Sequence, residues 1–532
     1  MNIKNIVAVF LVLGMISAPV HAQEKEQVEA LRQSMLELIK QLTKKGALTK
    51  ETAARLVRET EVVAQPEVAL SAVAATDVSA QSAVAAAEVL PVAETVAPDV
   101  VRVPYIPDSL KYEMAEIIKH DVLAQARGER WGEPGALPGW LSRVTLDGDF
   151  RLRFQSDRFP AGNATPTDFN PPGLTLVANT TDAHLYTRVQ ARLGVKAKIS
   201  DVTYTAFRFS TGSTSNPVSN NQTMGTGYNK YTLLLDRAFV HSDPTYWLAL
   251  NGGKMPNPWL STDLVWDGDV SFEGVAMQLK PQFTDSWSGF LTLGAFPYQD
   301  IERSNVVFAN SKWLYGTQLG MGWAAPNSSN FQLGLALYQF KNVEGTPNAT
   351  LGSHFYDKTA AQGMQKGNSL MYVNAVGDST IYGIASKFRE VSLTAKMDWA
   401  LFDPVHVLFA ADYVKNVGFK QDEILARTGL DAGTPKVKGH QVALTVGVPK
   451  MKRVGDWQAR VAYKYLEKDA VLDALTDSDF HLGGTNAKGF IVGGSYGVDD
   501  NAWLSLRWIS TDQIEGLPLS IDTLQLDLNT RF

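Results

Sequence analysis

The chain of 532 residues contains no cysteine. This absence excludes disulfides, thiolate metal sites and cysteine nucleophiles. The formal net charge of −6 is only mildly acidic, which gives no indication of nucleic-acid binding. After residue 22 the chain has no apolar run of about 18 residues, so we expect no transmembrane helix.

Recognisable catalytic and metal-binding patterns are also lacking. No Gly-x-Ser-x-Gly motif lies on a strand-to-helix turn, and the eight histidines lie apart along the chain without a partner motif. Asp267 and Asp269 offer oxygen ligands at short spacing, but no calcium loop of about twelve residues surrounds them. We therefore expect no enzyme, no metal and no cofactor. A barrel-shaped lipase or protease is the least favoured alternative.

Residues 1–22 have the pattern of a secretory signal peptide. Lys4 supplies the positive start, Ile6 to Ser17 the apolar stretch, and Val20-His21-Ala22 a small-x-small cleavage site. A membrane anchor is the competing interpretation, but the apolar stretch is short for a bilayer span. We expect an exported protein whose mature chain begins at Gln23.

Three segments follow before the main domain. In residues 23–62, apolar side chains at heptad spacing predict a coiled coil, or else one amphipathic helix of a hairpin. Residues 63–100 are rich in Ala and Val and are interpreted as a linker, with an Ala-rich helix as the alternative. Residues 101–140 predict a periplasmic helix and a turn-rich approach to the first strand.

From residue 141 to the C-terminus, the hydrophobic period becomes two. In the last strand Leu524, Leu526 and Leu528 share one face with Phe532, and polar residues fill the other face. Such alternation is typical of a sheet between lipid and water, because a soluble sandwich usually has shorter strands. We predict sixteen strands, and 342–389 could hide another hairpin. They lie near 143–155, 184–199, 202–211, 231–241, 246–255, 271–281, 287–297, 312–323, 330–341, 390–401, 405–416, 437–449, 456–467, 487–498, 501–511 and 520–532.

Short connections alternate with long ones along these strands. This pattern indicates a barrel with turns in the periplasm and loops outside. Six tryptophans lie within four residues of a predicted short turn, which favours an interfacial aromatic girdle. They are Trp247, Trp287, Trp323, Trp399, Trp457 and Trp503. The fold class is therefore all-β: a transmembrane antiparallel β-barrel of about sixteen strands, preceded by periplasmic helical segments and a linker.

A barrel of sixteen strands leaves an aqueous channel unless something folds inward. On the lumen-facing parity, basic side chains outnumber acidic ones. Four arginines on the first two strands are predicted to form a basic column that favours anions. Local pairing with Asp147 and Asp149 is the alternative. The column comprises Arg151, Arg153, Arg188 and Arg192.

The loop from Met255 to Glu273 is rich in Pro, Trp and carboxylates. We predict that it folds inward as a constriction opposite the arginines, with 342–389 as a competing plug. Its acids are Asp263, Asp267, Asp269 and Glu273.

Several motifs resemble those of the putative porin family of Gram-negative, proteobacterial outer membranes. They are Val103-Pro-Tyr-Ile-Pro107, Gly148-Asp-Phe-Arg-Leu-Arg153, Gly253-Lys-Met-Pro-Asn-Pro258 and Asp263-Leu-Val-Trp-Asp267. The resemblance implies a porin without catalytic residues, surrounded by outer-membrane lipid. General porins are similar in architecture and often trimeric, so we expect a homo-oligomer. Phe532 is expected to be the signal by which the C-terminal strand engages the barrel-assembly machinery.

Two functions follow. The first is a porin for passive diffusion of small polar solutes and ions, preferring anions. The alternative is a plugged structural barrel whose N-terminal arm tethers the outer membrane to the cell wall or to other subunits.

Overall fold

The computed structural model describes residues 143–171, 173–375, 377–429 and 431–532. The signal peptide, helical segment, linker and periplasmic helix predicted for 1–22, 23–62, 63–100 and 101–140 lie outside the described residues. Within the described ranges, no helix is long and apolar enough to cross a bilayer.

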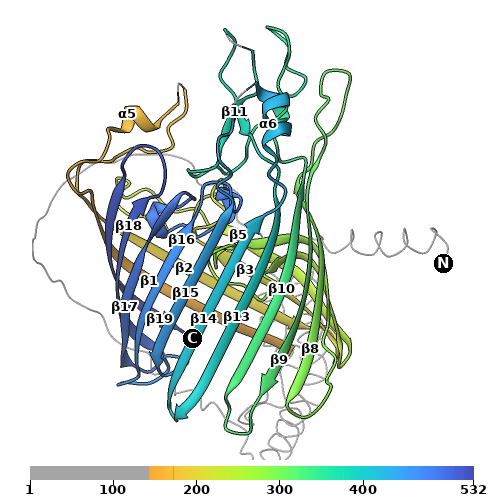
Figure 1. Cartoon of the computed structure of the whole chain (residues 1–532). Coiled ribbons are helices and arrows are strands. Elements are labelled where there is room, and N and C mark those ends of the chain that lie inside the picture. Colours follow the sequence, from red (N-terminus) through yellow and green to blue (C-terminus); the bar gives the residue numbers. More distant parts are fainter. Residues whose placement is uncertain (1–142, 172, 376, 430) are drawn as a thin grey trace, which may run out of the picture. The chain divides into compact units, whose positions relative to one another are not determined.

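A single antiparallel sheet closes on itself to form the barrel wall (Figure 1). The sheet has 17 strands, and one of them, β4 (Gln222–Thr223), has only two residues, so sixteen long strands build the wall. The predicted sixteen-stranded antiparallel barrel is confirmed. The wall strands are β1 (Val144–Arg158), β2 (His184–Lys198), β3 (Thr203–Ser210), β5 (Leu234–Thr245), β6 (Leu248–Pro256), β7 (Ser271–Leu279), β8 (Trp287–Gln299), β9 (Lys312–Ala324), β10 (Asn330–Lys341), β13 (Arg389–Phe402), β14 (Val405–Asn416), β15 (Lys438–Gly447), β16 (Trp457–Leu466), β17 (Ala487–Asp499), β18 (Ala502–Gln513) and β19 (Ser520–Arg531).

Closure occurs between the first and the last strand. β1 pairs with β2 on one side and with β19 on the other, where Arg153 lies opposite Asp527. At the end of this seam, the backbone N–H groups of Gly148 and Phe532 each donate to the other residue's carbonyl, at 3.1 and 3.0 Å. The chain therefore leaves no unpaired sheet edge between these strands.

The two-residue period sorts side chains between the outside and the lumen. Leu524, Leu526 and Leu528 are exposed on the outer face of β19, whereas Gln525 and Asp527 between them are buried inside. Apolar groups on a surface without protein neighbours are expected where lipid is the solvent.

Short turns join the strands at one end and long loops at the other (Figure 1). Trp247, Trp287, Trp399 and Trp457 are exposed near the short-turn end. Trp287 lies opposite Trp323 on the neighbouring strand. Trp503 has the lumen parity instead, and the Arg531 guanidinium lies 5.5 Å from its ring centroid.

The long loops contain the remaining elements. Loop 342–388 does hold a small hairpin, but this pairs β11 (Leu370–Tyr372) with β12 (Tyr382–Ile384) outside the wall. Short helices also occupy the long loops. They are α5 (Pro166–Phe169), α6 (Gln421–Thr428) and the 3-10 turns η2 (Asp357–Thr359), η3 (Asp473–Leu475) and η4 (Phe480–Leu482).

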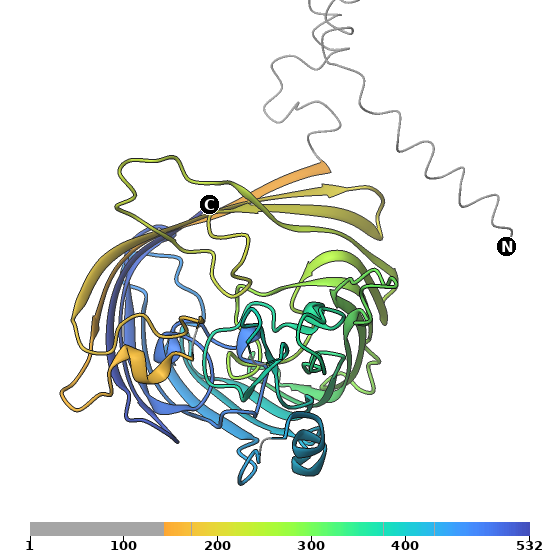
Figure 2. The ribbon, with the colours of Figure 1, turned by 90° about the horizontal axis from the view of Figure 1, so that it is seen from above.

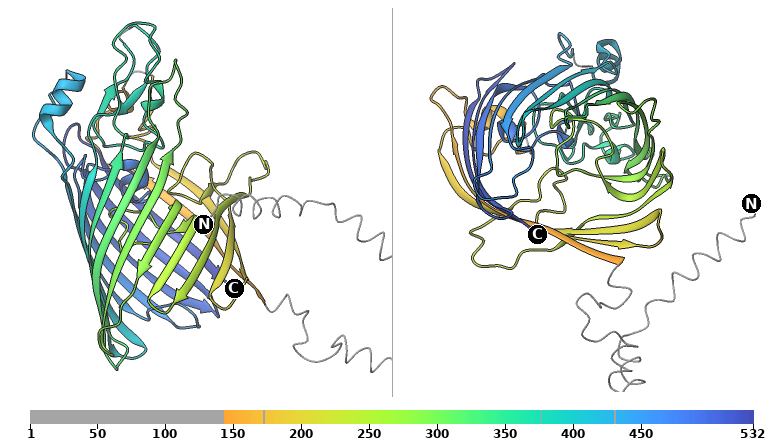
Figure 3. Two further views of the ribbon diagram at one scale, coloured as in Figure 1. Left: turned by 90° about the vertical axis from the view of Figure 1, so that its right-hand side faces the viewer. Right: turned by 90° about the horizontal axis from the view of Figure 1, so that it is seen from below.

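The principal apolar core lies inside the barrel rather than between two layers. Trp259 and Trp266 from loop 257–270 pack on Tyr338 and Phe272 of the wall, with ring centroids 5.0–5.3 Å apart. Seen from above, loop segments gather within the ring of strands (Figure 2). The wall is lowest along β3, β6 and β7, which have eight or nine residues each (Figure 3).

Candidate functional site

The four predicted arginines share the lumen face of β1 and β2. In the register of this pair, Arg192 lies opposite Asp149 and Arg188 opposite Arg153. Arg151 lies opposite Gln190, between these two rows. Opposite residues on one face of an antiparallel pair are close neighbours, so the four guanidinium groups belong to one patch of the wall.

Arg153 is neutralised by carboxylates on both sides. Its Nε donates to Asp527 at 2.8 Å and its Nη1 to Asp479 at 3.0 Å, and only 1% of the residue is exposed. Asp479 comes from loop 467–486 and also pairs with Arg507 of β18. This arginine fastens the loop to the wall, because a buried ion requires partners of opposite charge.

Arg192 makes a similar bridge at a more open position. Its guanidinium lies 3.0 Å from Asp149 on the neighbouring strand and 3.0 Å from Asp269 of loop 257–270. About a quarter of its side chain remains exposed. The predicted local pairing with Asp149 is therefore present for this arginine, together with a second acid that the loop supplies.

Arg151 and Arg188 have no carboxylate partner among the described residues. Arg151 Nη2 donates to Asn221 Oδ1 at 2.6 Å, and Arg188 Nη2 lies 3.5 Å from Ser219 Oγ. The Nε of each is buried without a hydrogen-bond acceptor. Neutral groups thus hold these two guanidinium groups in place, and carboxylates such as Asp479 act on their charge only at longer range.

Loop 257–270 crosses the lumen and is attached at several points of the wall. The backbone of Leu260 exchanges hydrogen bonds of 2.8 and 2.7 Å with the Gln318 amide of β9. Thr262 donates to Asp412 of β14 at 2.9 Å, and Asp263 accepts from Gln441 of β15 at 2.5 Å. With Asp269 bound to β2, the loop spans the barrel interior.

Asp263 is held in its ionised form. Burial raises the pKa of a carboxyl group, but the Lys464 ammonium, 3.8 Å away, and the Gln441 amide outweigh burial and hold the pKa at about 2. Lys464 is fully buried and also pairs with Asp477 at 2.7 Å. This group of charges locks the middle of the loop against β15 and β16.

Asp267 has the opposite electrostatic character. Burial, followed by the nearby carboxylates of Asp477 and Asp269, raises its pKa to about 8. Its two oxygens accept from the backbone N–H groups of Asp269 and Ser478, both at 2.8 Å. The side chain therefore joins loop 257–270 to loop 467–486, and none of the basic residues that the structure describes forms an ion pair with it.

Glu273 lies apart from the three loop acids. It belongs to β7, where Phe272 occupies the buried inner position and Glu273 takes the outward one. Its carboxylate is 2.5 Å from the Lys254 ammonium of β6, and 59% of its side chain is exposed. The alternation of the strand, which begins at Ser271, separates it from the crossing loop.

Loops 467–486 and 342–388 complete an internal assembly. Thr476 Oγ1 donates to Leu264 O at 2.9 Å, which ties loop 467–486 to the crossing loop. Gln365 Nε2 donates to Asp473 O at 2.7 Å and Ser369 Oγ to Asp469 at 2.6 Å, which ties in loop 342–388. The constriction and the competing plug predicted from the sequence are thus joined through loop 467–486.

Phe532 lies at the outer surface of the closing seam, where its ring covers Gly148 of β1. A side chain at position 148 would collide with this ring. The C-terminal aromatic residue and Gly148 therefore fit together where the barrel closes.

Two inward segments were not predicted. Segment 211–221 turns into the barrel, where Asn220 N donates to Asp269 at 3.1 Å. Loop 467–486 supplies Asp477 and Asp479, the partners of Lys464 and Arg153. The only hint in the sequence is that both segments are long, because hydrophobic periodicity describes strands and not the direction in which a loop folds.

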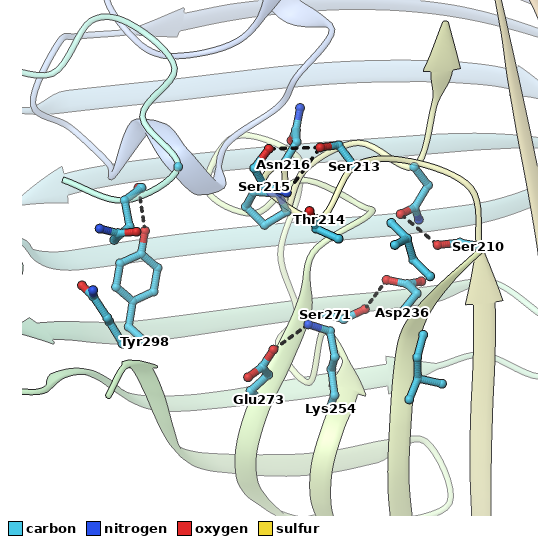
Figure 4. A pocket seen from close by; sticks show the side chains of 17 residues that line it. Ser210, Ser213, Thr214, Ser215, Asn216, Asp236, Lys254, Ser271, Glu273 and Tyr298 are labelled. Atoms are coloured by element: carbon cyan, nitrogen blue, oxygen red, sulfur yellow. Dashed lines mark hydrogen bonds and ion pairs between the residues drawn. The ribbon is translucent and has the colours of Figure 1, made fainter. Parts of the chain in front are cut away.

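A polar cavity of about 630 Å³ lies at the long-loop end of β5–β8 (Figure 4). Residues of segment 211–221, the tops of these strands and loop 342–388 surround it. A second cavity of about 340 Å³, near the short-turn end of β10 and β13–β16, is lined by Lys396 and Arg460. Neither lysine nor arginine there has a carboxylate partner among the described residues.

The family model described as "Putative porin" matches residues 32–532. The chain belongs to this family. It is an outer-membrane porin with a channel-type barrel, and porins catalyse no reaction. Curated proteins offer no sequence match to this porin.

Solved structures give more distant likenesses. Pseudomonas putida OprB at high pH is 11% identical, with a TM-score of 0.42, over 74% of this porin and 95% of that chain. An anion-selective porin from Comamonas acidovorans is 11% identical, with a TM-score of 0.39, over 73% and 99%. The outer membrane channel DcaP of Acinetobacter baumannii is 9% identical, with a TM-score of 0.38, over 74% and 98%.

Proposed function

We propose that this porin forms a water-filled channel for passive diffusion of small polar solutes and ions, and that it prefers anions. The observation that carries the proposal is that Arg151 and Arg188 lie on the lumen wall without a directly paired carboxylate among the described residues. Fixed positive charge in a narrow pore attracts anions and repels cations. Lys396 and Arg460 extend the basic lining toward the short-turn end.

Within this channel the crossing loop forms the constriction. Asp263, Asp267 and Asp269 anchor it, and Arg192 and Lys464 compensate two of them. The net field at the constriction then depends on Arg151 and Arg188, because Arg153 and Arg192 are each already in direct contact with two carboxylates.

The placement in the cell follows the same proposal. Residues 1–22 direct export, and the short turns and the N-terminal segments face the periplasm. The barrel assembles through its C-terminal strand and Phe532, and it associates with further copies of itself as a homo-oligomer, with a trimer as the simplest expectation.

Ion selectivity in a planar bilayer tests the channel. The double variant Arg151→Glu, Arg188→Glu should lower the anion-over-cation permeability ratio several-fold, because four units of charge change at the constriction. Lys230→Glu with Arg303→Glu makes the same change of charge in exposed loops and should leave the reversal potential close to that of the wild type. Equal reversal potentials for both doubles would remove the arginines from the proposal.

A plugged structural barrel is the second candidate. It is favoured by the mutual contacts of loops 257–270, 342–388 and 467–486 inside the wall. Purified porin that inserts into bilayers without producing conductance steps would select this alternative and exclude the channel.

A further inference from the structure

The cavity of about 630 Å³ at the top of β5–β8 has no role in the proposed channel. Figure 4 shows Ser213, Thr214 and Ser215 of segment 211–221 on one side and Tyr298 on another. Its volume lies within the range of about 300–1,000 Å³ that is typical of small-molecule sites. The lining is rich in hydroxyl and amide groups, which suits a polar ligand.

Two buried amide atoms on the cavity wall lack hydrogen-bond partners within the described part of the chain. One is Nδ2 of Asn220, a residue only 8% exposed, and the other is Oε1 of Gln299. Buried polar groups in folded proteins are almost always satisfied, so a free donor and a free acceptor beside one cavity require an explanation.

The orientation of Asn220 is fixed by its other polar groups. Its backbone N–H donates to Asp269 at 3.1 Å, its carbonyl accepts from Thr211 Oγ1 at 2.8 Å, and its Oδ1 accepts from Ser210 Oγ at 3.4 Å. The amide nitrogen is therefore left for a ligand. Rotation of the amide would only exchange the free donor for a free acceptor.

Hydroxyl groups of a ligand could pair with both amide atoms, because a hydroxyl group both accepts and donates hydrogen bonds. Its oxygen accepts a hydrogen bond from Asn220 Nδ2, and a hydroxyl proton donates to Gln299 Oε1. A ligand with several hydroxyl groups can also reach the surrounding serine and threonine side chains. Water meets the same requirement, but a cavity of this size holds a larger molecule with room for several such bonds.

The charges around the cavity indicate that the ligand is neutral. The Lys254 ammonium lies 2.5 Å from Glu273 at the exposed mouth, and Asp236 pairs with Arg208 of the neighbouring strand. Each carboxylate that lines the cavity thus has its own basic partner. A charged ligand would face no unpaired ion of opposite sign.

We propose that this cavity is a binding site for a neutral polyhydroxylated solute of mono- or disaccharide size. The inference is independent of conduction, because it requires only that the cavity be open to solvent. Free sugars and the sugar of a membrane glycolipid share this chemistry, so the experiment includes both.

Glucose, maltose and sorbitol are titrated into the full-length porin in a sugar-free amine-oxide detergent, and binding is measured by calorimetry. At least one should bind saturably. Asn220→Ala and Gln299→Ala should each weaken binding about tenfold, since each removes one hydrogen bond to the ligand. Gln332→Ala, which removes an amide from the other lumen cavity, should leave the affinity unchanged.

Four results decide the outcome. Absence of saturable binding to all three solutes and to dodecyl maltoside overturns the proposal, as does binding that both alanine variants leave unchanged. Binding of dodecyl maltoside alone supports the site and identifies a lipid-borne sugar as its source. Gluconate that binds more tightly than glucose contradicts the neutral class. Heat-dependent gel mobility confirms that each variant is folded, and Gln299→Glu offers an isosteric second variant.

Discussion

The two sides of the lumen solve the problem of interior charge in different ways. Along β14–β18 the wall is covered by loop 467–486, where Phe480 packs on Ile491 and Ile509, and Lys464 is completely buried between acids. Along β1 and β2, Arg192 and Asp149 keep about a quarter of their side chains exposed, and Arg151 and Arg188 meet neutral groups.

Two kinds of charge can therefore be distinguished. Some hold the inward-folded loops against the wall, and others can act on a solute. A buried ion must be matched by partners, because desolvation is costly and an unmatched ion destabilises the fold. A half-buried guanidinium held by amides and hydroxyls does not need a carboxylate in direct contact. Arginines that are no more than four positions apart on β1 or β2 therefore have different roles. Some hold the structure together, and others act electrostatically on a solute.

Replacing two neighbouring arginines of β1 in turn tests most directly whether their roles differ. Arg153→Gln leaves the buried carboxylates of Asp479 and Asp527 with fewer partners, and we expect a loss of about 3–5 kcal/mol in unfolding free energy. Arg151→Gln should cost less than about 1 kcal/mol, because none of the described carboxylates is directly paired with it. Denaturant unfolding followed by tryptophan fluorescence measures both, and equal losses would remove the distinction between the two rows.

A substitution at the closing seam is expected to cause an intermediate loss of stability. Gly148→Val places a side chain against the ring of Phe532, and such overpacking is expected to cost about 1–3 kcal/mol. Gly268→Val is the matched control, since a side chain there meets nothing within 4 Å. Thermal loss of the barrel form on gels compares the two variants, and similar midpoints would show that Phe532 moves aside freely.

The stability of the folded crossing loop is expected to depend on pH through Asp267. The pKa of Asp267 is raised to about 8 in the folded protein by burial and by Asp477 and Asp269. Because the unfolded carboxyl titrates near pH 4, this group favours the folded loop below that pH, and its contribution declines as the pH rises toward 8. Open-channel noise should therefore increase between pH 6 and pH 9.

Asp267→Asn should flatten this dependence, because an amide mimics the protonated acid. The exposed turn variant Asp201→Asn should behave like the wild type. Noise that rises equally in Asp267→Asn would assign the dependence to another group.

The smallest change in reversal potential is expected for Glu273, which lies apart from the loop acids. Glu273→Gln changes an outward, half-exposed pair with Lys254 and should barely alter the reversal potential. Asp269→Asn removes a partner of Arg192 and should shift selectivity toward anions. A larger shift for Glu273→Gln would place that residue in the ion path.

The wall of the barrel was predictable from the sequence, and the reason is physical. Lipid outside and water or packed loops inside impose a two-residue period on every strand, as Leu524 to Leu528 demonstrate. In the predicted strand 202–211 the two-residue alternation breaks near Phe207-Arg208. The register between β3 and β5 shifts at this place, between Arg208 and Phe209. Its neighbour β4 was missed, because two residues carry no period.

The contacts of the site were less predictable than its residue types. The four arginines and the crossing loop were identified from parity and composition, but the partners of Arg153 come from β19 and loop 467–486, more than 300 positions later. No local pattern encodes such a contact. The inward turn at Asn220 likewise depends on an acceptor, Asp269, that lies 49 positions later in the chain.

The low wall has a consequence for the surrounding bilayer. A strand of eight residues such as β3 reaches about 26 Å along its axis, which shrinks to roughly 19 Å across the membrane at a tilt of about 45°. The apolar band of outer-membrane barrels is about 25 Å tall, so lipid beside β3, β6 and β7 must thin, and that deformation has an elastic cost. Copies that turn their low sides toward one another would relieve it, so bilayer thickness itself becomes a force that orients the barrels in the plane of the membrane.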